Sequence, residues 1–195
     1  MKKLISFLLP VLFGGLLLCS CGSDISKYTQ DKAGFAKLDQ DFKAKFGSDA
    51  YYTDVTIGFT PGKNPGAGLN YNVIVTEDPS SLKMQQWTYN SYSKWVNTAE
   101  VTLEMGGDAN PQDFMFQLGD KISLEKVGEL IEKSAEKLAQ EKNIQNAVLN
   151  LAIIKTPDDM DVSNTRIVIM MKPENGGTAF NFYYDLDGNL LNFTY

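Results

Sequence analysis

The stretch FNFYYDLDGNLLNFTY, residues 180–195, has the pattern of a β-hairpin. Aromatic and polar residues alternate before Asp185, apolar residues return after Asn189, and Asp187 with Gly188 supplies the positive backbone angles of a tight turn. The stretch WTYNSYSKWV, residues 87–96, has a similar layout of aromatic strand, turn and apolar strand. It lies roughly 95 residues earlier, a spacing that indicates an internal duplication.

A helix and further strands precede each of these hairpins. The first helix has apolar residues at Phe35, Leu38, Phe42 and Phe46 and stops at Gly47, and the second has Ser123 as a capping residue. The apolar stripe of the second helix is Ile122, Val127, Leu130, Ile131, Ala135 and Leu138. Alternating segments follow at 51–60, 69–77, 84–91 and 94–105, and again at 144–156, 164–173, 177–185 and 189–195. The sequence therefore predicts an α+β fold of two repeated units, each one helix packed on a roughly four-stranded antiparallel sheet.

These elements divide the chain into five segments. Residues 1–20 are expected to be a lipoprotein signal peptide, 21–32 a flexible tether, 33–105 the first α+β unit, 106–120 a connection and 121–195 the second unit. The connection contains the apolar run 114–116, which we expect to pack against the domain.

The N-terminal residues have the pattern of a lipoprotein signal peptide. Lys2 and Lys3 precede an apolar run, residues 4–18, that is too short and too interrupted by proline and glycine for a membrane span. The following Leu18-Cys19-Ser20-Cys21 resembles the lipobox of bacterial lipoproteins, whose peptidase cuts before a cysteine that is then diacylated. The resemblance implies that Cys19 is removed and that Cys21 carries acyl chains such as palmitate. An ordinary secreted protein with a spare cysteine is the alternative, and it would leave an odd free thiol.

The lipobox resemblance also implies a place in the cell. It points to the envelope of a Gram-negative bacterium, with the membrane as partner through the acyl chains on Cys21. In lipoproteins an Asp after the cysteine favours the inner membrane, and here that residue is Gly22, which favours the outer membrane. Whether the domain faces the periplasm or the cell surface stays open.

The order of helix and strands resembles the PepSY-like and beta-lactamase-inhibitor-protein-like folds. The residues that carry this resemblance are the closing hairpin, 180–195, and its weaker counterpart at 87–104. Cystatin-like folds share the same helix-on-sheet arrangement. The resemblance implies a secreted or lipid-anchored module that binds or inhibits a partner.

Composition excludes several kinds of chemistry. The chain has no histidine, and with Cys19 removed and Cys21 acylated it has no thiol, so histidine bases, cysteine nucleophiles and His/Cys metal or haem sites are excluded. Lys2 and Lys3 leave with the signal, so of 18 basic side chains 16 remain against 24 acidic ones, which argues against nucleic acid. No cofactor is expected. An enzyme would depend on carboxylates such as Asp54, Glu77, Asp158 and Asp185.

Three loops could be taken for ligand sites. DLDGN, residues 185–189, resembles the start of a calcium loop, but Leu190 stands where glycine is required, so a hairpin turn is favoured. The acidic run with Asp158, Asp159 and Asp161 could hold a hard cation, although a solvated loop is favoured, and Asp158 and Asp161 stay weak metal candidates. PGKNPGAG, residues 61–68, departs from the phosphate-binding pattern and is interpreted as a hairpin loop.

The aromatic group Trp87, Tyr89, Tyr92 and Trp95 is the sharpest candidate for recognition. Exposed rings on a sheet could bind a glycan or a partner's loop. The favoured alternative is that these rings pack under a helix. We expect a lipid-anchored, non-catalytic binding or inhibitory module for a protein or glycan. The alternatives are a carboxylate-dependent hydrolase of envelope or dietary glycans and a structural or assembly lipoprotein without a small ligand; the oligomeric state is left open.

Overall fold

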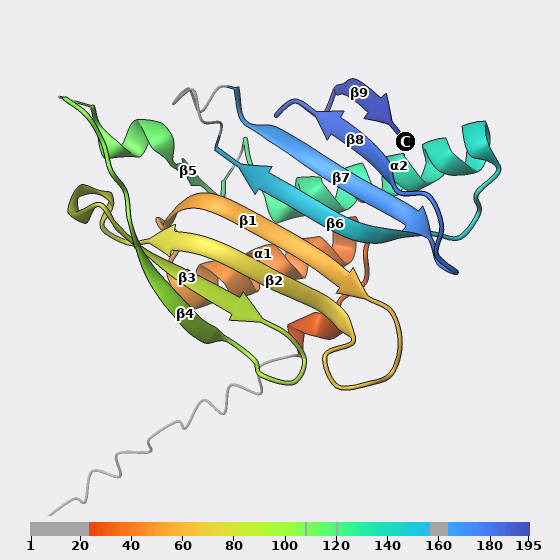
Figure 1. The fold of residues 1–195 in the computed structure, drawn as a ribbon, viewed down its shortest axis with the longest axis horizontal. Coiled ribbons are helices and arrows are strands. Elements are labelled where there is room, and N and C mark those ends of the chain that lie inside the picture. The colour runs from red at the N-terminus through yellow and green to blue at the C-terminus, as the bar shows by residue number, and fades with distance from the viewer. Residues whose placement is uncertain (1–23, 108, 120, 157–163) are drawn as a thin grey trace, which may run out of the picture.

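The computed structural model describes residues 24–107, 109–119, 121–156 and 164–195 (Figure 1). Two α-helices occur in these ranges, α1 (Lys32–Phe46) and α2 (Leu124–Lys142), with three short 3-10 helices, η1 (Ile25–Lys27), η2 (Pro79–Ser81) and η3 (Pro111–Phe114). The strands of the same ranges are β1 (Tyr51–Thr60), β2 (Gly68–Thr76), β3 (Lys83–Tyr89), β4 (Val96–Thr102), β5 (Phe116–Gln117), β6 (Ala147–Lys155), β7 (Arg166–Pro173), β8 (Phe180–Tyr184) and β9 (Leu190–Thr194). Neither α-helix combines the length and the hydropathy that a membrane span requires.

All of these strands belong to one antiparallel sheet. Its order is β4-β3-β2-β1-β6-β7-β8-β9, and β5 pairs with the first residues of β1. The prediction of two repeated helix-on-sheet units is wrong, because β1 pairs directly with β6, from Asp54 opposite Lys155 to Gly58 opposite Leu151. Two separate four-stranded sheets would leave β1 and β6 as edge strands with unpaired backbone groups, and pairing them removes these two edges, so that β4 and β9 are the edges of the joined sheet.

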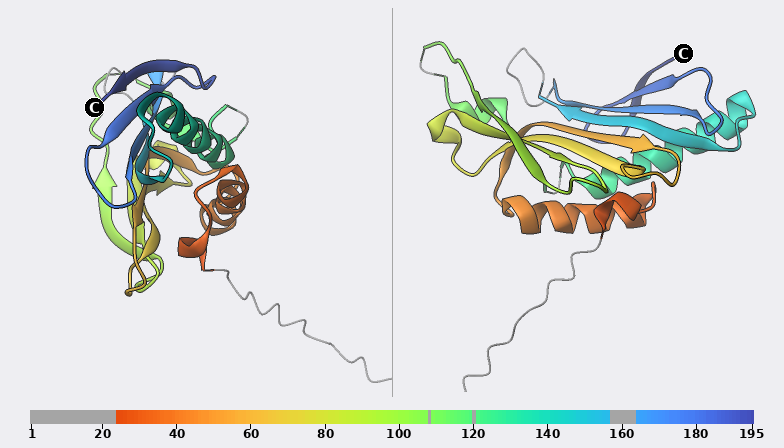
Figure 2. Two further views of the ribbon diagram at one scale, coloured as in Figure 1. Left: turned by 90° about the vertical axis from the view of Figure 1, so that its right-hand side faces the viewer. Right: turned by 60° about the horizontal axis from the view of Figure 1, so that its bottom comes forward.

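The two helices also belong to one layer. α1 and α2 pack against each other on the same face of the sheet (Figure 2). The buried carboxylate of Asp39 in α1 accepts the backbone N–H of Leu124, the first residue of α2, at 3.0 Å. Gly128 of α2 lies so close to α1 that a Cβ there would stand 2.5 Å from the carbonyl oxygen of Asp31. The helices therefore share a single core instead of covering one sheet each.

That core lies between the helix layer and the inner face of the sheet. Its largest fully buried side chains include Phe35, Leu38, Phe42, Tyr52, Ile57, Leu130, Leu138, Leu149 and Phe182. The apolar run predicted to pack does so in part: Met115 and Phe116 are buried, and Phe116 stacks on Tyr52 with the ring centroids 5.9 Å apart. The predicted helix signals are confirmed as well, since Ser123 accepts the N–H of Lys126 at 3.1 Å and Gly47 ends α1.

The segment before α1 lies against the sheet. Ile25 is buried, and its carbonyl accepts the hydroxyl of Tyr71 at 2.7 Å. Gln30 accepts the backbone N–H of Leu149 at 2.7 Å. Residues 21–23 of the predicted tether, Cys21 among them, lie outside the described residues, while residues 24–31 are attached to the domain by these contacts.

Candidate ligand-binding groove

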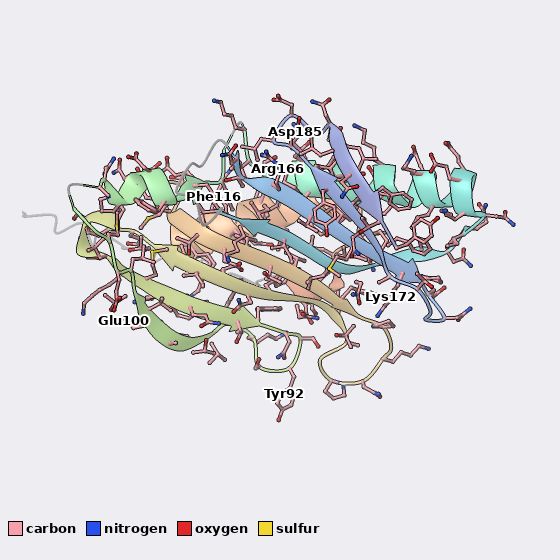
Figure 3. All side chains as sticks on the ribbon, turned by 45° about the horizontal axis from the view of Figure 1, so that its top comes forward. Tyr92, Glu100, Phe116, Arg166, Lys172 and Asp185 are labelled. Carbon is pink, nitrogen blue, oxygen red and sulfur yellow. The ribbon has the colours of Figure 1, made fainter. Side chains whose placement is uncertain are left out.

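The predicted aromatic group does not form a common exposed surface. Tyr89 is buried, and the rings of Trp87 and Trp95 pack on Phe46 of α1 at centroid distances of 6.1 Å and 5.1 Å. Tyr92 stands apart on the turn between β3 and β4, where it is 79% exposed and points away from the sheet (Figure 3). Packing under α1, the favoured alternative, therefore describes Trp87 and Trp95, while Tyr89 is buried against the rings of Tyr71 and Trp95.

Trp87 nevertheless lines a groove. The groove has a volume of about 490 Å³ and lies between the C-terminal end of α1 and the strands β2 and β3. The residues that line it include Lys45, Phe46, Glu77, Lys83, Trp87 and Glu100. Its apolar surface comes from Phe46, Val75 and Trp87, and charged side chains of both signs stand around this surface.

Contacts with its neighbours hold the indole of Trp87 in place. The Lys45 ammonium lies 4.1 Å from the ring centroid, a cation–π distance, and the indole N–H donates to Gln85 Oε1 at 3.2 Å. Across β3 and β4, Lys83 Nζ pairs with Glu100 Oε1 at 3.2 Å. The groove thus combines a fixed aromatic surface with hydrogen-bond donors and acceptors around it.

The turn between β2 and β3 forms one wall of the groove and is stabilised locally. The side chain of Asp78 accepts the N–H of Ser80 at 3.1 Å, and Leu82 takes a left-handed conformation that reverses the chain. The hydroxyl of Ser81 donates to the carbonyl of Asp78 at 2.7 Å. A wall fixed in this way loses little conformational freedom when a ligand binds.

The carboxylates predicted for acid/base chemistry lie in different parts of the fold. Asp54 is on β1 opposite Lys155, and burial raises the pKa of its carboxyl. Asp185 is in the β8–β9 turn, where hydrogen bonds from Asn189 hold the pKa of its carboxyl below its usual value. Of the candidates that the structure describes, Glu77 alone lines the groove. Asp158 lies outside the described residues.

The described residues also offer no cluster of metal ligands. No group of three or more acidic, cysteine or histidine side chains comes together within the described ranges, and Asp158, Asp159 and Asp161 lie outside them. The Asp185 carboxylate accepts the backbone N–H and the side-chain N–H of Asn189 at 2.8 Å and 2.9 Å, so DLDGN is a hairpin turn. Residues 61–67 connect the paired strands β1 and β2, as the hairpin interpretation of PGKNPGAG predicted.

A second surface lies on the face of the sheet away from the helices. Leu151 pairs with Met170 and Ile153 with Val168 across β6 and β7, and Tyr183 continues the row on β8. All five side chains are partly exposed, and together they form an apolar patch that we call the outer patch.

Sequence reasoning identified Trp87 but missed its neighbours. Lys45 comes from a helix and Glu100 from another strand, so no local motif joins them to Trp87. The Lys83–Glu100 pair follows from the register of β3 and β4, which opposes Lys83 to Thr102 and Gln85 to Glu100. The sequence does contain a signal for the outer patch. Every position of IVIMM, residues 167–171, is apolar, which indicates a strand with two apolar faces.

Comparison of the chain with models of known protein families, with curated proteins and with solved structures finds no match. The resemblances to the lipobox and to the PepSY-like folds therefore stay predictions from the sequence.

Proposed function

We propose that the chain is a lipid-anchored envelope protein whose groove binds a neutral glycan segment without catalysis. The observation that carries the proposal is the groove of about 490 Å³ with Trp87 in its surface and polar groups around it. Concave sites with an apolar surface and a few fixed polar groups are the usual form of small-ligand sites. Sugars present C–H faces that pack on aromatic rings and hydroxyls that exchange hydrogen bonds with such polar groups.

The charges around the groove favour a neutral ligand. Lys45 and Lys83 stand against Glu77, Asp78 and Glu100, so both signs are present and neither dominates. A strongly anionic or cationic ligand would meet like charges at close range, whereas hydroxyl groups can donate to the carboxylates and accept from the ammonium groups.

The envelope location in this proposal depends on the lipobox resemblance. Two acyl chains on Cys21 would hold the protein stably at a membrane. By the same resemblance Gly22 favours the outer membrane. Mass spectrometry of the mature N-terminus tests this part, because an unmodified Cys21 or a cut elsewhere would overturn it.

The glycan part is tested by screening the full acylated protein, in detergent, against envelope and dietary oligosaccharides, followed by calorimetry with each ligand found. Trp87→Ala should weaken binding at least tenfold, since a buried aromatic contact is worth about 1.5–3 kcal/mol. Tyr92→Ala removes an exposed ring outside the groove and is the matched control, with affinity expected to stay unchanged. Equal affinity in the two variants would refute the groove as the site.

The same ligands separate binding from hydrolysis. A carboxylate-dependent hydrolase would shorten the bound glycan over hours, which mass spectrometry of the mixture detects. We expect the glycan to be recovered intact. Glycan shortening that is lost in Glu77→Gln would favour the hydrolase.

The outer patch supports a second candidate, a protein partner. Its partly exposed residues Leu151, Ile153, Val168 and Met170 adjoin one another across two strands, and apolar patches of this kind often mark protein interfaces. A Val168→Lys variant should abolish capture of that partner from an envelope extract while leaving glycan binding unchanged.

A further inference from the structure

Three segments far apart in the sequence meet where the described chain begins. They are residues 24–28 with η1, residues 60–67 from the last residue of β1 to β2, and residues 89–95 from the last residue of β3 to β4 (Figure 1). We call them together the basal end. The contacts described below lie toward the ends of β2 and β3 that are away from the β2–β3 turn, which forms one wall of the groove.

Hydrogen bonds and an ion pair join these segments. Asp24 Oδ1 accepts the hydroxyl of Tyr89 at 2.9 Å and pairs with Lys94 Nζ at 3.3 Å. The N–H of Gly66 donates to the hydroxyl of Ser91 at 2.9 Å, which ties the two loops together. The basal end is therefore a built surface whose parts hold each other in place.

The first residues of the domain also lie directly on β2. At Gly68 a Cβ would stand 2.3 Å from the carbonyl oxygen of Ser26, so only a glycine allows this approach. Ile25 is buried beneath it and bound by the Tyr71 hydroxyl. These contacts fix the point at which the chain leaves the domain toward Cys21.

The charge of the basal end is opposite to that of the whole molecule. Its three segments contain Lys27, Lys63 and Lys94, with Asp24 as their one acidic residue, in a chain with 18 basic and 24 acidic side chains. The side chains of Lys27 and Lys94 are 79% and 54% exposed, and Lys27 and Lys63 line the same shallow hollow. Lys27 and Lys94 both pair with Asp24, at 3.8 Å and 3.3 Å, so the three lysines leave a local excess of positive charge, which attracts an anionic partner.

Tyr92 adds an apolar and hydrogen-bonding group to this surface. It is the most exposed large hydrophobic side chain of the described residues, at 79%, and it projects from the basal end away from the sheet (Figure 3). Tyrosine is enriched at the interface between lipid headgroups and water, where its ring and its hydroxyl are both satisfied.

The length of chain between Cys21 and the domain limits the position of a bilayer. Cys21 precedes Asp24 by three residues, which span at most about 11 Å even when fully extended. If Cys21 is acylated, its acyl chains lie in the membrane and Asp24 lies within that distance of it. The tether therefore holds the basal end, which contains Asp24, close to the headgroups.

We propose that the basal end rests on the headgroup layer of an anionic bilayer, with Lys27, Lys63 and Lys94 over the lipid phosphates and Tyr92 at the interface. The inference rests on the acylation of Cys21 that belongs to the proposed function. β2 rises about 3.3 Å per residue, and Val73, which pairs with Trp87, is five residues from Gly68 at the basal end, so Trp87 stands about 16 Å above this end of the sheet. The contact sets the orientation of the domain as well as its location.

The test uses the full acylated chain in vesicles of phosphatidylethanolamine and phosphatidylglycerol. Because the acylated chain should have no free thiol, a single introduced cysteine carries a fluorophore, either at the basal end (Asn64→Cys) or at η3 on the far side (Gln112→Cys). Both positions are exposed. We expect a lipid with a nitroxide headgroup to quench the fluorophore at residue 64 several-fold more than the one at residue 112.

A charge-matched comparison tests the lysines. Lys27→Gln with Lys63→Gln should lower the quenching at residue 64 toward its value in neutral phosphatidylcholine vesicles. Lys83→Gln with Lys121→Gln changes the net charge equally, away from the basal end, and should leave the quenching unchanged. Raising the ionic strength should lower the quenching at residue 64 as Lys27→Gln with Lys63→Gln does, because salt screens exposed charges.

Two outcomes overturn the inference and can be told apart. Equal quenching at residues 64 and 112, with acylation of Cys21 verified by mass spectrometry, overturns the orientation and leaves the anchor intact. An unmodified Cys21 overturns the anchor and the orientation together. Binding of a glycan in the groove is measured separately and does not depend on either result.

Discussion

Removing the hydroxyl of one tyrosine should destabilise the protein, and removing that of another should not. Tyr71 is buried and donates its hydroxyl hydrogen to the Ile25 carbonyl at 2.7 Å. Tyr52 is 1% exposed, and its hydroxyl has no hydrogen-bond partner among the described residues. Burial raises the pKa of both phenols, so both are neutral at pH 7, and their hydroxyls differ in hydrogen bonding.

The size of the difference follows from these contacts. Tyr71→Phe removes a buried hydrogen bond and should lower the free energy of unfolding by about 1–1.5 kcal/mol. Tyr52→Phe removes a buried hydroxyl whose desolvation is uncompensated, so the free energy of unfolding should stay equal or rise by about 1 kcal/mol. The two variants should therefore differ by about 2 kcal/mol, which corresponds to about 4–8 °C in Tm for a domain of this size.

Circular dichroism during thermal and urea denaturation measures the Tm and the free energy of unfolding. The protein used is residues 21–195 with Cys21→Ser, which needs no detergent. Tyr71→Phe should in addition speed tryptic cleavage after Lys27, since it loosens the segment that precedes α1. Tyr52→Phe should leave that cleavage rate unchanged. A Tyr52→Phe variant that loses as much stability as Tyr71→Phe would refute the reasoning.

Two further substitutions test the helix contact and the basal end. Gly128→Ala should lower the free energy of unfolding, measured by urea denaturation, by about 1–3 kcal/mol, because the new Cβ would lie 2.5 Å from the Asp31 carbonyl oxygen. Alanine normally favours a helix, so the helix propensity alone would predict the opposite effect. Gly106→Ala is the control and should change the free energy of unfolding little, since a Cβ there has nothing within 4 Å. The pKa of the Asp24 carboxyl is lowered to about 2, mainly by the hydrogen bond from the Ser26 hydroxyl. The stabilisation that the ionised carboxylate provides is therefore complete above about pH 4 and is lost as the pH falls toward 2. The NMR shifts of Ile25 should follow that loss in the wild type and stay flat over the same pH range in Asp24→Asn.

Local sequence patterns predicted the elements of this fold but not their assembly. The alternation in YYTDVTIGFT predicted a strand at 51–60, and β1 has those bounds. Alternation reports which side chains are buried, whereas the neighbour of a strand depends on contacts between distant residues. The β1–β6 pair joins residues roughly 100 positions apart, and nothing in either strand alone specifies it. The repeated order of helix and strands therefore predicted two sheets where the structure has one.

The candidate groove shows the same limit at the level of single residues. Trp87 was recognised from its type, but its surroundings depend on α1, which brings Lys45 over one ring face and Phe46 to its edge. A tryptophan in an amphipathic strand is compatible with a core position, with an exposed platform or, as here, with a groove at the edge of the core. The choice among them requires the position of the helix relative to the strand.

The continuous sheet matters for the proposed function because it joins the basal end to the groove. β2 runs without interruption from Gly68, which lies on Ser26, to Thr76, which lines the groove. Two units linked by a hinge could rotate independently, and an orientation set at the membrane would then be lost at the ligand site. Since β1 pairs on both sides and the helices share one core, a contact that orients the basal end also orients the groove. Labels at residue 64 in the first half and residue 187 in the second, both exposed, should therefore give one narrow distribution of distances, whereas two units joined by a hinge would give a broad one.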